Sequence, residues 1–523
     1  MKSLLPQKAH FYIYIFSIIL LVIGMPLSKF LMSLSQIILI CNWILSGHLK
    51  SKFSSFFNNK AALVLSSLLL LHFIGLLYTT DYGYAYGDLR IKVPLFILPL
   101  ILSTSPVLSK KITDLIFHLF VGAIIVASAI STLILFNVIH RHIVDIRNIS
   151  IFISHIRFAL LICVAVFISI YLMRGATQQK LKIVYGCVIA WLLIFLVLME
   201  SVTGMAALCV VAAVLIIYKI CTLQNVVLKY SILLVLLVIT IYSGSMVYSV
   251  LNTDAKTDAV NFTKLEPLTK QGNLYYHDTA ATEYTENGHY IWLYYCEKEL
   301  KEEWQKRSSM DFNWKDKKGN VLRFTLARFM TSKNLRKDAE GMKQLSDDDI
   351  RAVERGVTNV NYQNISSIKG RLHELAWEIQ MYKATGDANG HSLTQRFEYW
   401  KAAKGIIAEH PLIGVGTGDI KNAFDEQYEK THSTLIKEFR FRSHNQYLSI
   451  TVAFGIIGLL WFLITLIYPM IKLNKTFDFL YITFFIVATV SFLTEDTLET
   501  QAGVNFYAFF NAFLLFVHNP KKE

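Results

Sequence analysis

Charged residues are scarce in this chain. They make up 17% of its 523 residues, whereas a soluble protein of this size carries about 25%. Hydrophobic residues make up 54%, and long apolar runs recur along the chain, which excludes a soluble globular protein and predicts a multi-span membrane protein. The first run, from Phe11 to Met25, lacks a small-residue cleavage site and is followed at once by further runs. We therefore expect a membrane anchor there and not a removed signal peptide.

Cysteine is also scarce, with six residues in the whole chain. Five of them lie in apolar runs or at the end of one, and only Cys296 falls in the large polar segment, where it has no obvious partner. This distribution shows neither a disulfide framework nor the spacing of a zinc site. The chain shows no internal repeat and no low-complexity tract either.

The net charge of +13 is not concentrated in one basic domain. Residues 254–398 contain 22 basic and 22 acidic side chains, so the longest polar segment is neutral. The excess of lysine and arginine lies mainly in the short loops between apolar runs, where it determines the topology of membrane proteins. The charge therefore gives no indication of nucleic-acid binding.

The apolar runs predict twelve spans, and hence an all-α integral membrane protein with one large polar segment between spans nine and ten. The fourth span is short and contains Pro94 and Pro99, which membrane helices tolerate when neighbours satisfy the freed backbone groups. The predicted spans cover about residues 10–28, 30–47, 61–79, 89–105, 113–138, 150–173, 182–199, 202–219, 228–249, 445–471, 477–494 and 501–518.

The loops on one side of these spans hold 16 basic residues and three acidic ones, whereas the short loops on the other side hold six basic and seven acidic residues. The positive-inside rule then places both termini in the cytoplasm and the segment 250–444 outside. We expect three parts: membrane spans in 1–249, the external segment 250–444, and membrane spans in 445–523.

The external segment divides further. Residues 254–392 are too rich in aromatic residues and leucine for disorder and predict a small folded lobe. Within it, residues 297–307, 347–355 and 371–383 have helical patterns, and Ser346 is a predicted N-cap.

Residues 393–444 and the start of the tenth span carry the motifs that the rest of the chain is organised around. An amphipathic helix ends at His410-Pro411, because proline cannot continue a helix. A glycine-rich turn follows, which lacks the lysine and hydroxyl of a nucleotide phosphate loop. His444 and Asn445 then stand just ahead of an apolar helix. The other residues of note are Arg396, Tyr399 and Trp400 on the helix, and Gly414, Gly416 and Gly418 in the turn.

Taken in order, the pattern Arg-x-x-x-Trp, "HPLIGVGTGD", "HNQYL" and "FGIIGLL" resembles the O-antigen ligase family of bacterial membrane proteins. Members attach O-polysaccharide to lipid A–core, and polymerases and protein-glycosylating transferases share the architecture. The resemblance implies a glycan donor on polyprenyl (undecaprenyl) diphosphate and an acceptor hydroxyl on lipid A–core. It also implies transfer with inversion, without cofactor, metal or ATP. The location would be the inner membrane, with the site facing the periplasm.

His444 is the candidate catalytic residue. A neutral histidine takes a proton from a hydroxyl near physiological pH. From the residues alone, a histidine that caps or solvates a helix end is the simpler interpretation. The resemblance favours the general base, because the proposed catalytic histidine of the family occupies this motif.

Arginines on the outer face form the second candidate group, because planar paired donors suit a diphosphate. We expect Arg157 and Arg396, with Arg90 in support, to hold it. Arg157 lies about two turns into an apolar run, where an ionisable group suggests function. The alternative for Arg157 is an ion pair with Asp88, Asp145 or Glu200, and Arg141 and Arg147 are interpreted as solvated. Supporting roles are expected for Asn445, Arg442, Trp400, Gly414 and Gly416.

Three further features are ambiguous. His155 either assists Arg157 or packs, and positions i and i+2 of a helix do not share a face. Family members often carry a serine-arginine pair where this chain reads "ESVTG" from Glu200, without an arginine. Glu495, Asp496 and Glu499 could bind a divalent metal or hold the arginines, and we favour the second interpretation.

Within the family, a polymerase or a protein-glycosylating ligase shares the donor and cannot be separated from a lipid A–core ligase by one chain. A transporter of lipid-linked glycans is the alternative from another class. The spans lack the two-half symmetry that many transporters carry.

Overall fold

The computed structural model describes residues 5–141, 146–251, 257–363 and 367–518. Regular structure in these ranges is almost wholly helical, with one short antiparallel pair of strands, so the all-α class is confirmed. Up to the large polar segment the elements are α1 (Gln7–Leu27), α2 (Lys29–Leu45), α3 (Leu49–Asn58), α4 (Lys60–Ile74), η1 (Gly75–Tyr78), α5 (Tyr82–Lys92), α6 (Pro94–Thr104), α7 (Lys110–Leu135), η2 (Ile146–Ile149), α8 (His155–Gly175), α9 (Gln179–Leu198), α10 (Val202–Cys221) and α11 (Val226–Leu251).

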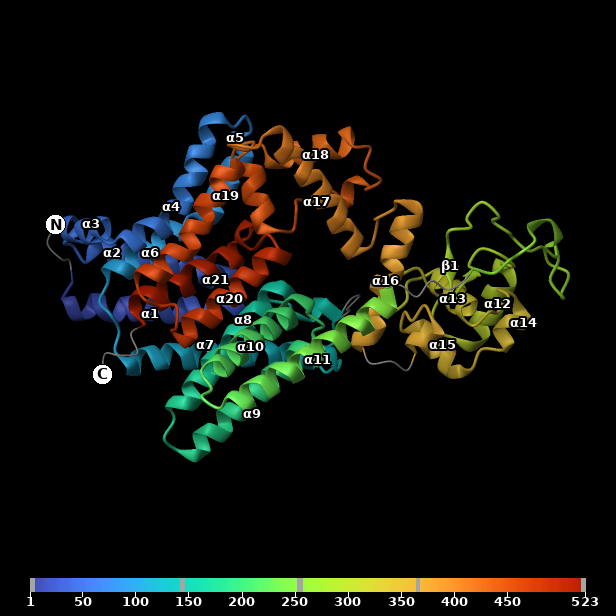
Figure 1. The fold of residues 1–523 in the computed structure, drawn as a ribbon, viewed down its shortest axis with the longest axis horizontal. Helices are drawn as coiled ribbons and strands as arrows, with labels where there is room; N and C mark the ends of the chain where they lie inside the picture. The colour runs from blue at the N-terminus through green and yellow to red at the C-terminus, as the bar shows by residue number, and fades with distance from the viewer. Residues whose placement is uncertain (1–4, 142–145, 252–256, 364–366, 519–523) are drawn as a thin grey trace.

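The rest of the chain forms a lobe and then returns to the helical body. Figure 1 shows the body at one end of an elongated molecule and the lobe at the other, with α16 and α17 between them. These elements are η3 (Phe262–Lys264), β1 (Thr285–Glu286), β2 (His289–Tyr290), α12 (Glu297–Arg307), α13 (Leu322–Ser332), α14 (Ala339–Lys343), α15 (Asp347–Glu354), η4 (Val360–Tyr362), α16 (Ser367–Thr385), α17 (Ser392–Glu409), α18 (Ile420–Lys430), η5 (Lys437–Phe439), α19 (Gln446–Lys472), α20 (Phe479–Thr494), η6 (Thr497–Glu499), α21 (Gln501–Ala512) and η7 (Phe513–Val517).

Seven helices in the described residues are long and apolar enough to cross a membrane, and each coincides with a predicted span. They are α1, α4 with η1, α7, α8, α9, α10 and α19. The other predicted spans are less regular. The pair α2–α3 bends by 111°, and part of α11, α20 and α21–η7 are apolar but shorter. The predicted span 89–105 is divided between α5 and α6, because α6 begins at Pro94. The number of twelve spans stays a prediction.

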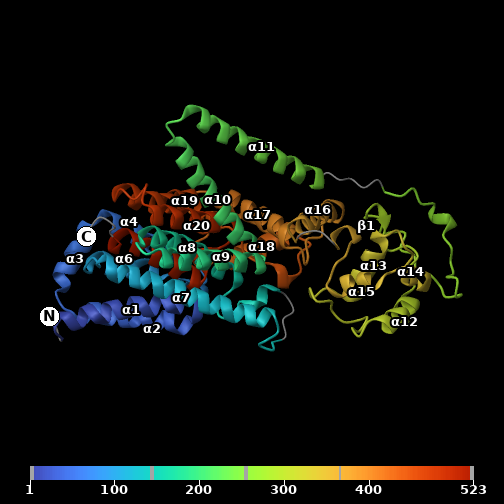
Figure 2. The same cartoon turned by 90° about the horizontal axis from the view of Figure 1, so that it is seen from below.

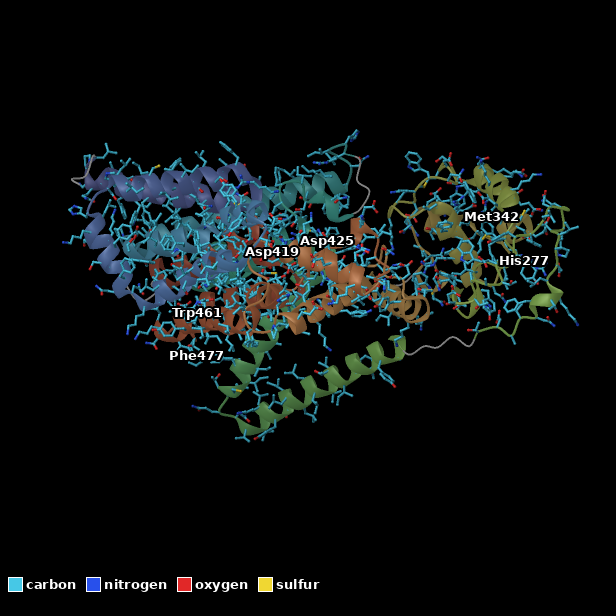
Figure 3. All side chains as sticks on the ribbon, turned by 90° about the horizontal axis from the view of Figure 1, so that it is seen from above. His277, Met342, Asp419, Asp425, Trp461 and Phe477 are labelled. Atoms are coloured by element: carbon cyan, nitrogen blue, oxygen red, sulfur yellow. The ribbon has the colours of Figure 1, made fainter. Side chains whose placement is uncertain are left out.

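The body packs around α8, whose side chains are buried along most of its length against α7, α9, α10 and α20. By contrast, α9 and α10 expose many apolar side chains, and α11 stands apart from the body in Figure 2. Trp461 and Phe477, labelled in Figure 3, are further exposed aromatic side chains of the body. Apolar surface of this extent is costly in water but not in lipid, which agrees with a membrane protein.

The lobe has a hydrophobic core of its own, around the fully buried side chains of Trp304, Phe312 and Phe329. Figure 3 shows Met342 within this lobe, well away from Asp419 on the body side. The predicted helix 297–307 is present as α12. Ser346 caps α15 and forms a capping box with Asp349, so the predicted N-cap is confirmed.

The helix α19 is broken at Gly455, and the glycine-rich turn packs into this break. At Gly455 the backbone leaves the helix, with φ 63° and ψ −166°, a region that is essentially restricted to glycine. Residues 411–416 pack into the break, so backbone groups that a continuous helix would pair internally bond to this turn instead. The bonds run from Val415 N to Val452 O (3.0 Å), Gly416 N to Ala453 O (2.8 Å), Ile456 N to Pro411 O (2.9 Å) and Ile457 N to Leu412 O (3.3 Å).

The break predicts that Gly455→Ala destabilises the protein. A Cβ at this position would lie 2.2 Å from the carbonyl carbon and oxygen of Leu412, and the backbone strain alone costs about 1–3 kcal/mol. We expect a clearly lower apparent melting temperature in detergent. Gly122→Ala is the matched control, because Gly122 lies within α7 with nothing near its added Cβ. Equal melting temperatures for the two variants would contradict this account of the turn.

The charge distribution predicts the topology. A reporter active only outside the cytoplasm should be active when fused after residue 300, and one fused at Lys110 should be inactive. Cytoplasmic reporters should give the reverse pattern, and fusions just beyond each position are the controls. Activity at Lys110 with none at residue 300 would invert the placement of every site residue.

Candidate functional site

The stretch that leads into His444 is held by three aromatic donors. They come from α17 and α18 and bond to alternate backbone carbonyls of residues 439–443, as expected where an extended chain points alternate groups to one side. The bonds are Tyr399 Oη to Phe439 O (2.9 Å), Tyr428 Oη to Phe441 O (2.7 Å) and Trp400 Nε1 to Ser443 O (3.0 Å). The chain is thereby fixed before it enters α19.

His444 stands at the turn into α19. Its backbone has φ 46°, a left-handed conformation, and its N–H donates to Oδ2 of Asp496 at 3.1 Å. The N–H of Asn445 donates to the other oxygen of Asp496 at 3.0 Å. The side chain of Asn445 is the N-cap of α19 and accepts from Leu448 N. The imidazole stacks on the ring of Tyr399, with centroids 5.5 Å apart, and its side chain is 35% exposed.

Glu495 joins His444 to the two principal arginines. One carboxylate oxygen of Glu495 accepts from Arg396 at 2.9 Å, and the other lies 3.8 Å from Arg157 and 3.5 Å from Nδ1 of His444. Burial raises the pKa of Glu495, but the imidazole and the two guanidinium groups together bring it below the usual value. The carboxylate, only 3% exposed, is therefore kept ionised among three basic groups.

Glu499 organises a second group of cations. Its Oε2 accepts from Arg442 at 2.9 Å and from Lys92 at 2.7 Å, and Gln446 donates to its Oε1 at 3.1 Å. These cations outweigh the effect of burial and hold the pKa of Glu499 well below its usual value. Lys92 also pairs with Asp88 within α5. The second group thus ties α5 and α19 to the loop that contains η6.

Asp496, the third carboxylate of this loop, binds the start of α19. Besides the two backbone N–H groups at the start of α19, it accepts from Oγ of Ser449 at 2.7 Å. The three carboxylates of the last loop therefore face different partners. In the described part of the chain, no three side chains of histidine, cysteine, aspartate or glutamate are grouped as metal ligands.

Arg157 is placed differently from the expectation in one respect. It was expected two turns into an apolar helix, but α8 begins at His155, so Arg157 lies in the first turn. Residues 150–154 are not helical, and Arg157 contacts Oγ of Ser154 at 3.4 Å. Its carboxylate neighbour is Glu495, which the alternative ion pairs did not include. Glu200 is exposed, and Asp145 lies outside the described residues.

Arg90 is not brought into this group. It is exposed on α5, two positions from both Asp88 and Lys92, and residues so spaced do not share a helix face. Within the described residues no hydrogen bond or ion pair of its side chain is found. Arg141 is exposed as well, and the side chain of Arg147 lies outside the description.

The supporting glycines serve the break in α19 and do not contact His444. A Cβ on Gly414 would lie 2.4 Å from the backbone of Ala453, and one on Gly416 would lie 2.9 Å from Gly75 O. A cavity of about 630 Å³ lies beside this turn, but His444 does not line it. We place the candidate site by the charged groups around His444 and not by this cavity.

Sequence reasoning assigned no role to two residues of the arrangement. Tyr399 follows Arg396 by three positions, so helical spacing alone puts them on one face, and the ring supports His444. Lys92, two positions after Arg90, was given no role. Its spacing of four residues from Asp88 was the available signal for an ion pair.

Part of the chain is similar to a known protein family. Residues 342–463 match the family model described as O-antigen ligase, and no curated protein matches the chain. The matched segment contains Arg396, Trp400, Arg442 and His444, whereas Arg157 and Glu495 lie outside it. The segment that carries the motifs is therefore similar to the O-antigen ligase family, and the chain around it contains the apolar helices of a membrane protein.

Proposed function

We propose that the protein transfers a glycan from polyprenyl diphosphate to a sugar hydroxyl of lipid A–core on the periplasmic side of the inner membrane. The observation that carries this proposal is the sharing of Glu495 by His444, Arg157 and Arg396. A proton acceptor and two diphosphate-binding groups are thereby gathered around one buried carboxylate, at the start of an apolar helix. The transfer needs both functions at one place.

His444 is the proposed general base. Nδ1 of the imidazole faces Glu495 at 3.5 Å, a distance too long for an ordinary hydrogen bond but short enough for strong attraction once the ring is charged. With a proton on Nδ1, Nε2 is left to accept the proton of the acceptor hydroxyl. Glu495 then stabilises the imidazolium that forms, and Tyr399 keeps the ring in place.

Arg157 and Arg396 are the proposed diphosphate-binding residues. A guanidinium has five N–H donors, and in the described residues each of these two arginines uses only one of its terminal nitrogens for the contacts above. The remaining donors suit anionic phosphate oxygens. Side-chain exposures of 16% and 26% leave both groups accessible from the outer face.

The reaction is a single displacement. The acceptor oxygen forms a bond to the anomeric carbon while the bond from that carbon to the diphosphate oxygen breaks, which inverts the configuration. The proton of the acceptor passes to His444, and the electron pair of the broken bond leaves with polyprenyl diphosphate. The two arginines stabilise the charge that develops on the leaving group.

A deletion strain tests the proposed acceptor. We expect loss of capped lipopolysaccharide while long polyprenyl-linked polymer is still made. Complementation with the wild-type chain should restore capping, and gel analysis of lipopolysaccharide with analysis of extracted lipids gives the readout. Accumulation of single repeat units would indicate a polymerase, and unchanged lipopolysaccharide with unglycosylated protein would indicate a protein ligase.

A further inference from the structure

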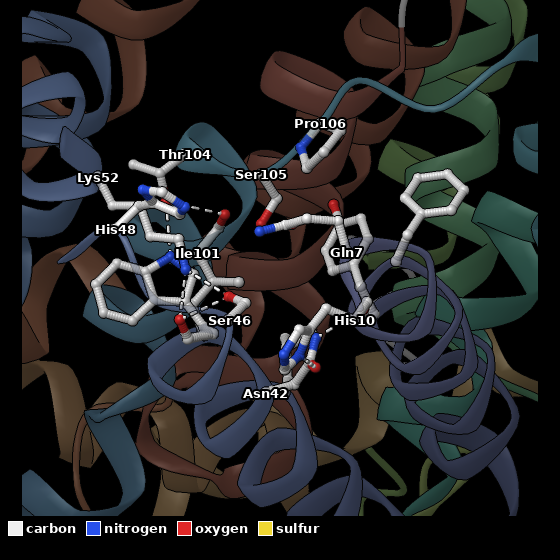
Figure 4. A pocket seen from close by; sticks show the side chains of 14 residues that line it. Gln7, His10, Asn42, Ser46, His48, Lys52, Ile101, Thr104, Ser105 and Pro106 are labelled. Atoms are coloured by element: carbon white, nitrogen blue, oxygen red, sulfur yellow. Dashed lines mark hydrogen bonds between the residues drawn. The ribbon is translucent and has the colours of Figure 1, made fainter. Parts of the chain in front are cut away.

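A second polar pocket lies far from His444. It has a volume of about 230 Å³ and is lined by the first turns of α1, the end of α2, the start of α3 and the end of α6. Figure 4 shows the side chains of Gln7, His10, Lys52 and Ser105 around it. Figure 1 places these elements at the end of the body opposite to the lobe. The transfer reaction makes no use of this pocket.

The lining of this pocket favours an anion. Its described lining contains the ammonium of Lys52, the imidazoles of His10 and His48, and several hydroxyl and amide groups, but no carboxylate. Lys52 is held by the carbonyl of Trp43 and by Oγ of Ser46, at 2.6 Å from the latter. An ammonium has three donors, so one N–H of this fixed cation is left for a ligand.

His10 adds an unused acceptor. Its side chain is 4% exposed, and Nδ1 lies 2.7 Å from Oδ1 of Asn42, whose Nδ2 donates to the carbonyl of His10. This pair of bonds puts the proton on Nδ1 and leaves a lone pair on Nε2. Nε2 is buried and has no hydrogen-bond partner among the described residues. Buried polar atoms are normally paired, so a ligand hydroxyl that donates to Nε2 would remove this deficit.

The position of the pocket suggests where such a ligand comes from. The short helix α3 turns 111° from α2 and exposes Lys50 beside Phe53 and Phe57. Helices with basic and aromatic side chains of this kind lie along the headgroup layer of a membrane, and basic pockets between helices on the cytoplasmic side bind anionic head groups. Ligand pockets usually have volumes of roughly 300–1,000 Å³. This pocket is smaller, so it can hold a head group but not a whole glycolipid.

We propose that this pocket binds a phosphate ester that carries a free hydroxyl, of the phosphoglycerol type, with the phosphate at Lys52 and the hydroxyl at Nε2 of His10. The same chemistry is available from two sources, the head group of phosphatidylglycerol and a soluble phosphate ester such as glycerol 3-phosphate. The ligand would tie α1, α2 and α6 together at the membrane surface.

Binding of short-chain phosphatidylglycerol, short-chain phosphatidylcholine and glycerol 3-phosphate to the full-length protein in detergent tests the proposal, for example by native mass spectrometry. Phosphatidylglycerol should bind at least about tenfold more tightly than phosphatidylcholine, because choline has no hydroxyl to donate to Nε2 of His10 and a buried acceptor left unpaired costs about that factor. Lys52→Gln should weaken phosphatidylglycerol binding by a similar factor. Lys50→Gln, an exposed lysine on the same helix that does not line the pocket, should leave it unchanged.

Lys52 also binds the end of α2, so Lys52→Gln could reduce binding by disturbing the fold. A second variant separates these two effects. Ser105→Met fills the pocket without changing the hydrogen bonds of Lys52, and it should abolish binding by occupying the space of the ligand. Binding of glycerol 3-phosphate that depends on Lys52 would support the proposal with the soluble ester as the source. Equal binding of the two lipids, or phosphatidylglycerol binding that survives both Lys52→Gln and Ser105→Met, would overturn the proposal.

Discussion

Purified His444→Ala protein is expected to bind polyprenyl-diphosphate glycan and to fail to transfer it. Proton transfer by a positioned base contributes roughly 10²- to 10⁴-fold to the rate, whereas the substitution leaves the arginines of the proposed diphosphate site in place. The measurement is formation of a new glycosidic bond on lipid A–core in detergent, with donor binding followed separately. The wild type should transfer the glycan without ATP and in the presence of EDTA.

Two controls separate chemistry from structure. The left-handed backbone at His444 strains alanine, but asparagine tolerates this conformation, so His444→Asn should fold like the wild type and still fail. His410→Ala changes an exposed histidine beside the glycine-rich turn, in the lining of a cavity that neither His444 nor Glu495 lines, and it should retain activity. Full transfer by His444→Asn would leave His444 a structural residue. Movement of the lipid across vesicles by wild type without any new bond would favour a transporter.

Arg157→Lys and Arg396→Lys should each lose most of the activity. Lysine keeps the charge but not the planar donors that match phosphate oxygens. Loss of one ionic hydrogen bond of about 1.5–3 kcal/mol corresponds to roughly 10- to 100-fold in rate. Unlike His444→Asn, both variants should also weaken donor binding, so the defect should appear in KM as well as in kcat.

The matched control is Arg141→Lys. Arg141 is exposed in a loop on the same predicted side of the membrane, and its substitution should cost little. Arg90→Lys decides whether an exposed arginine outside the Glu495 group takes part, and a large loss there would bring α5 into the donor site. If Arg141 proves the sensitive residue while Arg157 and Arg396 tolerate lysine, the diphosphate site has been assigned to the wrong residues.

Much of the fold could be predicted from local patterns. The helix at 297–307 and the cap at Ser346 depend on neighbouring residues, so the sequence contains their signal. The break of α19 depends instead on a turn about 40 residues upstream, and an apolar run with one glycine reads as a continuous span. The start of α8 at His155 was missed for a related reason, because Ile151, Phe152 and Ile153 extend the apolar run without being helical.

The candidate site shows the same division. The motif indicated His444 and Arg396, because both lie in one segment. Nothing in the sequence says which of several outer-face arginines meets which carboxylate. Glu495 follows α20 and is 99 residues from Arg396 on α17. Only the packing of α17 and α20, together with α8, which carries Arg157, brings these residues together. Arg442 and Lys92 meet at Glu499 for the same reason.

The shared carboxylate of Glu495 connects the proposed diphosphate site to the proposed base. In the resting protein Glu495 is divided among Arg157, Arg396 and His444. A diphosphate that draws the two arginines toward itself would leave the carboxylate of Glu495 to the imidazole alone. The proton of the acceptor would then be taken up most readily in the complex that also holds the donor, which couples proton transfer to occupancy of the diphosphate site.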